Sequence, residues 1–146
     1  MHDLSAVAYS SAAVLPLTTR DLDALLVGAR SFNQTVNVTG ALLHHDGNFL
    51  QYFEGPPAAV ASVYRRIRNS GQHENLVELL NQPLDTRQFS NWHMAFAEAT
   101  ASVLQEICTD RWEITRSSLD SQPAPSPGLA LLLAFLDKAI HVPSHS

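Results

Sequence analysis

The sequence predicts an α+β fold with one central sheet, and three observations lead to this prediction. Short segments whose apolar side chains alternate with period two recur between residues 4 and 98, as expected for strands. Two segments with the helical spacing of apolar residues lie among them, which gives the order βαββαββ. Beyond residue 100, two amphipathic segments follow that can cover a second face of the sheet.

Composition narrows the classes of protein that fit. The 146 residues suffice for one domain core, and the net charge of -5 argues against nucleic-acid binding, which needs clustered basic residues. One cysteine, Cys108, excludes an internal disulfide and suits a reducing compartment, so we expect a cytoplasmic location. The N-terminus lacks the pattern of a signal peptide, and the apolar run at 129–135 is far shorter than the ~20 residues of a membrane span. We therefore expect no association with membranes.

The first strand is predicted over residues 4–11, with Tyr9 on the same face as Val7. The helix that follows begins at a capping box formed by Thr18 and Asp21. Its inward stripe is expected to end on an amide, because Asn33 continues the helical spacing of the apolar residues. The members of this stripe are Leu22, Leu25, Leu26, Ala29 and Asn33.

A hairpin and a second helix come next. The segments 36–45 and 47–55 read as strands, and the Asp46-Gly47 pair between them is a strong hairpin signal because glycine tolerates positive φ. Pro56 and Pro57 open the second helix, which Gly71 is expected to end. The inner stripe of this helix comprises Val60, Val63, Tyr64 and Ile67.

Two more strands and a helical tail complete the chain. Residues 75–84 are predicted as the fourth strand and 91–98 as the fifth. The tail is expected to form a C-terminal helical extension over 101–146, with a Pro/Ser linker near 121–128 and a very apolar helix from Gly128 to Ile140. Residues 1–100 would form the domain proper.

This order of elements is typical of a ferredoxin-like sheet with both helices on one face, and we expect the C-terminal helices to pack on the other face. Strands one and three are neighbours in such a sheet, so Tyr9 and Gln51 come within hydrogen-bonding reach. Asn33, Trp92 and Met94 can point into the same layer. Either these groups form a satisfied buried network, or they hold a polar cofactor between the helices. The residue types leave both interpretations open.

Several short motifs in register resemble one family, the BLUF domains, which are flavin-binding blue-light sensors. The similarity runs from about Leu4 to Glu98, and the chain resembles the short, single-domain BLUF photoreceptors and not the multidomain forms. The motifs are Tyr9 in "AYSS", Asn33 before "VTGALL", Gln51 in "DGNFLQYFEGP", His73 in "GQHENL", and Trp92 with Met94 in "RQFSNWHM". Each motif alone is unspecific, and their joint spacing carries the resemblance.

The resemblance implies a cofactor and a role for each residue. The cofactor would be FAD, with FMN or riboflavin as alternatives, held with its ring between the two helices. Tyr9 would donate an electron and a proton, and Gln51 would bridge Tyr9 to the flavin. Asn33 would hydrogen-bond the flavin edge, while Trp92 and Met94 would tune and transmit the state of Gln51. A glutamine suits this relay because it has both a donor and an acceptor.

Four further residues are expected to contact the cofactor. Arg30, Arg66 and His73 lie near predicted helix ends, where a ribityl-phosphate chain could emerge; ordinary solvated positions are the alternative. Phe49 shares a face with Gln51 and could contact the ring or simply belong to the core. Phe32 stands where many family members have a polar residue, which puts the flavin contacts of the first helix in doubt.

The expected function is a blue-light sensor without substrate turnover. We expect no fused output domain, so the signal would pass to a separate partner or to the oligomeric state, as a homodimer or larger assembly. The alternative is a photochemically silent, ferredoxin-like domain that binds a ligand or a partner. A flavin-dependent oxidoreductase is disfavoured, since no substrate acid/base site is visible. The pairs His44-His45 and His141/His145 lack the pattern of a metal site and are expected to be solvated.

Overall fold

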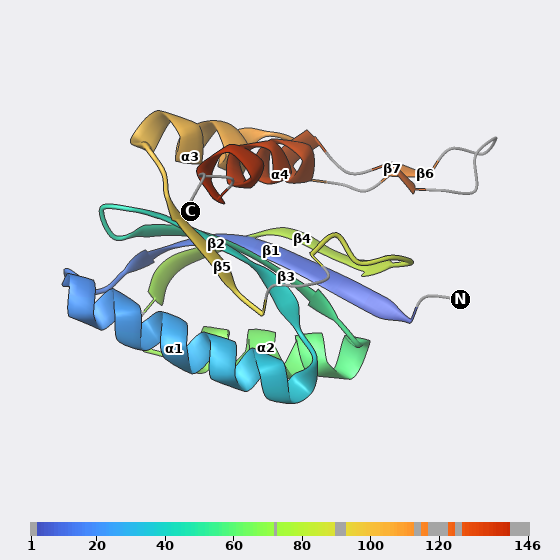
Figure 1. Ribbon diagram of the computed structural model, residues 1–146, viewed down its shortest axis with the longest axis horizontal. Coiled ribbons are helices and arrows are strands. Elements are labelled where there is room, and N and C mark those ends of the chain that lie inside the picture. Colours follow the sequence, from blue (N-terminus) through green and yellow to red (C-terminus); the bar gives the residue numbers. More distant parts are fainter. Residues whose placement is uncertain are drawn as a thin grey trace, which may run out of the picture.

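The computed structural model describes residues 3–71, 73–89, 93–112, 115–116, 123–124 and 127–140. A mixed five-stranded sheet in the order β4-β1-β3-β2-β5 forms the centre of the molecule. Helices α1 and α2 cover one face of this sheet, and α3 and α4 cover the other (Figure 1). The predicted α+β class and the order βαββαββ are confirmed.

The elements of the sheet layer follow the sequence closely. They are β1 (Leu4–Ala13), α1 (Thr19–Val36), β2 (Thr39–His45), β3 (Asn48–Gly55), α2 (Pro57–Asn69), β4 (His73–Leu84) and β5 (Ala95–Glu98). Several boundaries differ from the prediction. Strand β1 ends at Ala13 instead of residue 11, β2 begins at Thr39 instead of residue 36, β3 at Asn48 instead of residue 47, and β4 at His73 instead of residue 75. Strand β5 begins at Ala95, and residues 90–92 lie outside the described residues. Helix α2 ends at Asn69, where Ser70 leaves the helix in an extended conformation, so Gly71 is not the residue that ends it.

The tail contains α3 (Ala101–Thr109), β6 (Thr115–Arg116), β7 (Pro123–Ala124) and α4 (Pro127–Ile140). Two helices were expected here, and both are present. The linker predicted near 121–128 is only partly a linker, because residues 123–124 pair with β6 and residues 127–128 belong to α4. Its other four residues lie outside the described part of the chain.

Capping residues define both ends of helix α1. The Thr18 hydroxyl accepts a hydrogen bond from the Asp21 amide at 3.0 Å, and the Asp21 carboxylate accepts one from the Thr18 amide at 3.0 Å. This predicted capping box is therefore present. At the other end Asn37 adopts a left-handed conformation, with φ of 63°. Leu26 and Asn33 are buried between these ends, as the stripe predicted.

The β2–β3 hairpin sets which residues of β3 face the helices. Asp46 and Gly47 have φ of 47° and 81°, so both central turn residues adopt the positive φ that a tight two-residue hairpin needs. The turn fixes the pairing of His45 with Asn48 and of Leu42 with Gln51. A one-residue slip would turn Gln51 to the other face of the sheet.

The sheet separates two groups of core side chains. On the side of α1 and α2, Val7, Tyr9 and Phe53 pack against Val60 and Val63 of α2. On the other side, alanines of β1 and β5 and aromatic rings from β3 and the tail enclose the apolar faces of α3 and α4. The central members of this second core are Ala6, Ala8, Tyr52, Phe89, Leu104, Ile107, Trp112, Leu129, Leu132 and Leu136. The C-terminal helices thus pack on the second face, as expected.

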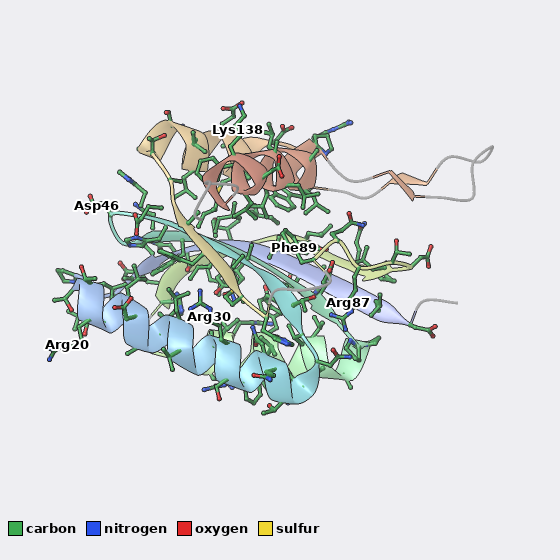
Figure 2. The ribbon with its side chains drawn as sticks, in the orientation of Figure 1. Arg20, Arg30, Asp46, Arg87, Phe89 and Lys138 are labelled. Carbon is green, nitrogen blue, oxygen red and sulfur yellow. The ribbon has the colours of Figure 1, made fainter. Side chains whose placement is uncertain are left out.

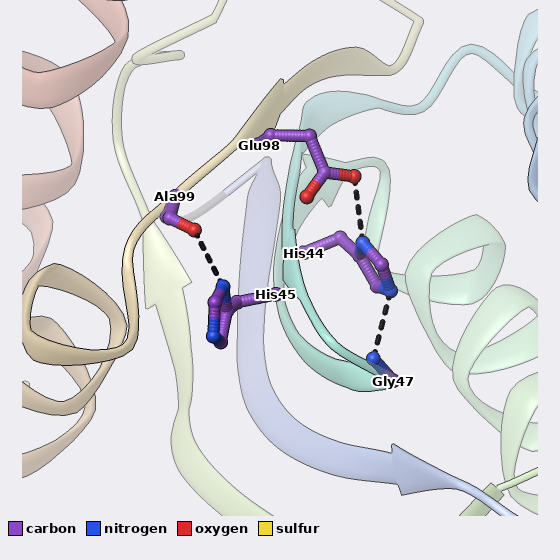
Figure 3. A network of polar contacts seen from close by, with 5 residues as sticks. All are labelled: His44, His45, Gly47, Glu98 and Ala99. Atoms are coloured by element: carbon purple, nitrogen blue, oxygen red, sulfur yellow. Dashed lines mark hydrogen bonds and ion pairs between the residues drawn. The ribbon is translucent and has the colours of Figure 1, made fainter. Parts of the chain in front are cut away.

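His44 and His45 hold β5 and the hairpin turn in place (Figure 3). The Nδ1 atom of His44 lies 2.7 Å from a carboxylate oxygen of Glu98, and its Nε2 accepts the Gly47 amide at 3.0 Å. The Nδ1 atom of His45 lies 3.0 Å from the carbonyl oxygen of Ala99. The expectation that these two histidines are solvated is therefore wrong, since His44 is only 12% exposed. Within the described residues, no cluster of potential metal ligands is found.

In the part of the chain that is described, no helix combines the length and the apolar character needed to cross a bilayer.

Candidate functional site

A cavity of about 250 Å³ lies between α1, α2 and the sheet face that they cover. Most of the residues that the sequence singled out line it, although they come from separate elements. These residues are Tyr9, Asn33, Phe49, Gln51, Arg66, His73 and Met94. Arg30 lies outside the cavity wall, and Trp92 is among the residues that the structure does not describe.

Tyr9 and Gln51 form the polar centre of this wall. They are direct partners on the adjacent strands β1 and β3, and their side chains are 1% and 6% exposed. The Tyr9 hydroxyl donates a hydrogen bond to the Gln51 Oε1 atom. Burial raises the pKa of Tyr9 well above its ordinary value, and the neighbouring Tyr64 raises it further. The phenol is therefore protonated at any ordinary pH and can act as a donor.

The nitrogen of the Gln51 amide points the other way, toward β5. It contacts the Met94 Sδ atom at 3.7 Å. A thioether is a weak acceptor, whereas an amide nitrogen carries two N–H groups. Gln51 therefore keeps donor capacity for an acceptor atom on a molecule in the cavity.

Two side chains of helix α1 form hydrogen bonds to the backbone just before β5. The Asn33 side-chain amide donates to the carbonyl oxygen of His93 at 2.9 Å, and the Arg30 guanidinium donates to that of Met94 at 2.9 Å. The Nδ1 atom of the His93 ring lies 3.2 Å from the carbonyl oxygen of Val38, just before β2. Arg30 thus positions Met94, while its predicted role toward the cofactor stays untested.

Aromatic rings close the cavity beside Tyr9. The centroid of the His73 ring lies 5.7 Å from that of Phe49 and 6.2 Å from that of Tyr9, in edge-on arrangements. His73 Nδ1 is 3.0 Å from the Ser11 hydroxyl, and burial lowers the pKa of His73, which favours a neutral ring. A second cavity of about 460 Å³ shares Phe49 and His73 with the first, so space continues toward the β1–α1 loop.

Phe32 and Arg66 lie at the rim of the cavity between the two helices. The Arg66 guanidinium lies over the Phe32 ring, 4.3 Å from its centroid. This contact joins α1 to α2 across the cavity. It also gives a structural role to the aromatic residue that departs from the family pattern.

Sequence reasoning missed two residues close to this site. Tyr64 stacks on Tyr9 with centroids 6.2 Å apart and planes 24° apart, although it was assigned only to the core stripe of α2. Glu54 is fully buried on the face of β3 opposite to Gln51. Its signal was present in the sequence, because Glu54 alternates in phase with Tyr52 and so places a carboxylate on an apolar sheet face.

This arrangement suits a flat, conjugated ring with one polar edge. Apolar walls from Leu25, Phe32 and Ile67 can contact the faces of such a ring. The amides of Asn33 and Gln51 offer hydrogen-bonding groups to its edge, with donor and acceptor properties that a flavin edge can match. The residues present therefore fit the flavin that the sequence resemblance implies.

Comparisons with known proteins agree with this fit. A family model described as "Sensors of blue-light using FAD", abbreviated BLUF, matches residues 4–95. The chain is similar to the photoactivated adenylate cyclase subunit beta of Euglena gracilis, with 35% identity over 109 residues. These residues make up 71% of this chain but 13% of the Euglena protein, so this chain matches only a small part of that relative.

Two solved structures show the same likeness. The dark-state structure of BlrB, described as a BLUF protein, is 26% identical with a TM-score of 0.63, covering 67% of this chain and 74% of that chain. The structure of Klebsiella pneumoniae BlrP1 in a manganese/cy-diGMP complex is 27% identical with a TM-score of 0.65. That match covers 91% of this chain and 32% of that chain.

Proposed function

This chain belongs to the BLUF family of blue-light sensors that use FAD, and on this premise we propose that Tyr9, Gln51 and Met94 form its light-responsive relay. The observation that carries the proposal is the continuous line of contacts from the Tyr9 hydroxyl through the Gln51 amide to the Met94 sulfur. Asn33, Phe49, Arg66 and His73 hold the cofactor in the proposed site. Trp92 is proposed to tune the relay, as its place in the motif suggests.

A bound flavin supplies the absorption of blue light and, once excited, the ability to accept one electron. Tyr9 would then serve as the electron donor. Because burial keeps its phenol protonated, an oxidised Tyr9 would have a strongly acidic hydroxyl, whose proton would pass to the Gln51 Oε1 atom. Gln51 would return a proton to Tyr9 once Tyr9 is reduced again. The relay therefore needs a group that can both accept and donate at position 51.

Gln51 passes the change on to β5 through its orientation. In the structure its nitrogen faces Met94, whose sulfur accepts the contact. If the amide turns over or tautomerises, the group that faces Met94 has an altered capacity to donate, and this contact weakens. Since Arg30 and Asn33 hold the backbone at 93–94, the change is transferred to the start of β5.

The flavin form is proposed to be FAD, as the family description names it. Arg66 is exposed at the rim and carries a charge that can pair with a phosphate. Arg66→Gln is expected to weaken FMN and FAD binding about threefold to tenfold and to leave riboflavin binding unchanged. Quenching of flavin fluorescence measures all three affinities, with Arg66→Lys as the matched control. Equal losses for all three flavins would show that Arg66 only supports Phe32.

The output of the sensor is proposed to leave through the tail side of the sheet. The Euglena relative is named as a cyclase, so light there is linked to an enzyme. For this chain we propose a separate protein partner or a change of homo-oligomeric state as the receiver, a cytoplasmic location, and no substrate turnover of its own.

Reconstitution with flavin tests the proposal. The purified protein is expected to turn yellow on addition of FAD and to show a small, reversible shift of its absorption to longer wavelength under blue light. A protein that stays colourless with flavin present would support the photochemically silent binding domain instead. Bleaching by a reductant with steady turnover of a substrate would indicate an oxidoreductase. Either result would overturn the sensor assignment.

A further inference from the structure

We propose that Glu54 is a positioning residue of the light response, because its buried carboxylate anchors the chain that leads into Met94. The proposal rests on the sensor function proposed above and adds a residue that the relay does not contain. Glu54 lies three residues beyond Gln51 on β3, but it faces the tail helices, whereas Gln51 faces the cofactor site.

The Glu54 carboxylate binds the connection between β4 and β5 directly. Its Oε2 atom accepts the backbone amides of Gln88 and Phe89, each at 2.6 Å. Its Oε1 atom accepts the Tyr52 hydroxyl at 2.7 Å. Both oxygens are therefore satisfied within the protein, although the side chain is fully removed from solvent. Burial raises the pKa of Glu54, while the bonds from Phe89, Tyr52 and Gln88 lower it.

The adjoining residues tie this connection to both sides of the sheet. The Phe89 ring belongs to the tail-side core, where its centroid lies 5.4 Å from that of Tyr52. The Arg87 guanidinium donates to the Thr39 hydroxyl and to the carbonyl oxygen of Asn37, each at 2.8 Å, where α1 leads into β2. Arg87 and Phe89 are labelled in Figure 2.

Only a short length of chain separates this anchor from the relay. His93 and Met94 are held by α1 on the cofactor side, and Phe89 is held by Glu54 on the tail side. Described contacts also join the two sides. The Nδ1 atom of His93 lies 3.2 Å from the carbonyl oxygen of Val38, and the neighbouring residues Asn37 and Thr39 accept hydrogen bonds from Arg87. In this proposal a displacement of Met94 reaches Arg87 and Phe89 through these contacts, and Glu54 holds Phe89 in the position from which it acts on the tail. Phe89 in turn contacts the core that holds α3 and α4.

The role of Glu54 requires an acceptor at this place more than it requires a charge. A glutamine at position 54 can direct its oxygen at both amides and its nitrogen at the Tyr52 hydroxyl, so every bond has a counterpart. A leucine fills a similar volume and leaves both amides without an acceptor. Glu54→Gln therefore keeps the hydrogen-bond acceptor without the charge, whereas Glu54→Leu keeps only the volume of the side chain.

Hydrogen exchange of the full chain tests the anchor, first without flavin. In Glu54→Leu the amides of Gln88 and Phe89 are expected to exchange about tenfold faster or more, and in Glu54→Gln within about threefold of the unchanged protein. Tyr52→Phe is the control that removes one bond of the carboxylate without touching the connection. Unchanged exchange at Gln88 and Phe89 in Glu54→Leu would overturn the anchor.

The same measurement with flavin, in darkness and under blue light, tests the transmission. Glu54→Leu is expected to keep the absorption shift but to lose at least about half of the light-induced exchange change in α3 and α4, whereas Glu54→Gln keeps it. If Glu54→Leu does not fold, Gln88→Pro removes one of the two amide donors with Glu54 intact and is expected to lower the change as well. An undiminished light-induced exchange change in α3 and α4 in Glu54→Leu or in Gln88→Pro contradicts the proposal. An absent absorption shift in the unchanged protein would instead refute the sensor function, while the flavin-free experiment still decides on the anchor.

Discussion

At the scale of single residues, the protein places buried amide side chains between the sheet and helices α1 and α2, where apolar side chains would be expected. Gln51 is 6% exposed and Asn33 is 2% exposed, yet each side chain has a protein partner in the structure. These partners do not use all the donors of the two amides. A buried amide with remaining capacity is costly in an ordinary core and useful in a cofactor site.

His73 gives a prediction for stability against pH. Burial lowers its pKa below the ordinary value of 6.5, so the unfolded chain binds the proton more readily than the folded protein does. Stability should therefore fall as the pH drops below that value toward the folded pKa. His73→Gln can keep a bond to Ser11 and removes this titration. Between about pH 7 and pH 5, the urea midpoint of the unchanged protein is expected to fall more than that of the variant.

Glu54 also has a shifted pKa, which is raised, but its carboxyl group titrates in both the unchanged protein and the variant. The difference between the two midpoint curves therefore reports on His73 alone. Parallel midpoint curves over this pH range would show that the folded environment of His73 does not disfavour its charged form.

At the scale of elements, two glycines show how closely β2 and β3 approach. A Cβ atom at Gly40 would lie 2.0 Å from the carbonyl oxygen of Tyr52, which leaves no room for any side chain between these strands. A Cβ atom at Gly28, within α1, would have no heavy atom within 4 Å. The hairpin that carries Gln51 therefore depends on Gly40, whereas α1 does not depend on Gly28.

Alanine at each position tests this contrast. Gly40→Ala is expected to destabilise the flavin-free protein by roughly 2–3 kcal/mol, because backbone must shift to admit the methyl group. Gly28→Ala is expected to stabilise it by about 0.5–1 kcal/mol through higher helix propensity. Urea unfolding measures both values. A tolerated Gly40→Ala would mean that β2 and β3 can separate at little cost.

At the scale of the whole molecule, one sheet serves two cores. Successive residues of β1, such as Ala8 and Tyr9, face the tail helices and the cofactor side respectively. The tail covers a sheet face that would otherwise expose apolar side chains. Close contact of α4 with Trp112 holds this layer, since a Cβ atom at Gly128 would lie 2.4 Å from the indole ring.

Gly128→Ala should therefore loosen the tail layer. We expect a loss of roughly 1–3 kcal/mol in unfolding free energy and a shift of tryptophan emission to longer wavelength as Trp112 becomes exposed. Ala134→Ser, at an exposed position on the same helix, is the control and should leave the emission unchanged. Unaltered emission in Gly128→Ala would mean that α4 repacks without moving from Trp112.

Much of the fold could be predicted because each signal is local. The Thr18 capping box and the Asp46-Gly47 turn act within a few residues, and both are present. The alternation within each strand predicted the faces of Tyr9 and Gln51, and the order of the elements predicted that the two strands are neighbours. The Glu54 anchor and the Phe32–Arg66 contact could not be predicted, because they join segments distant in sequence. The partners of His44 depend in the same way on where β5 and the hairpin turn come together.

The light-minus-dark absorption difference of the flavin-loaded protein tests the central claim, that the Tyr9–Gln51 pair is the photochemical relay. The unchanged protein is expected to give a reversible difference signal. Tyr9→Phe removes the donated proton and Gln51→Leu removes its acceptor, so each should bind flavin and give no reversible signal. A normal reversible signal in either variant would contradict the account.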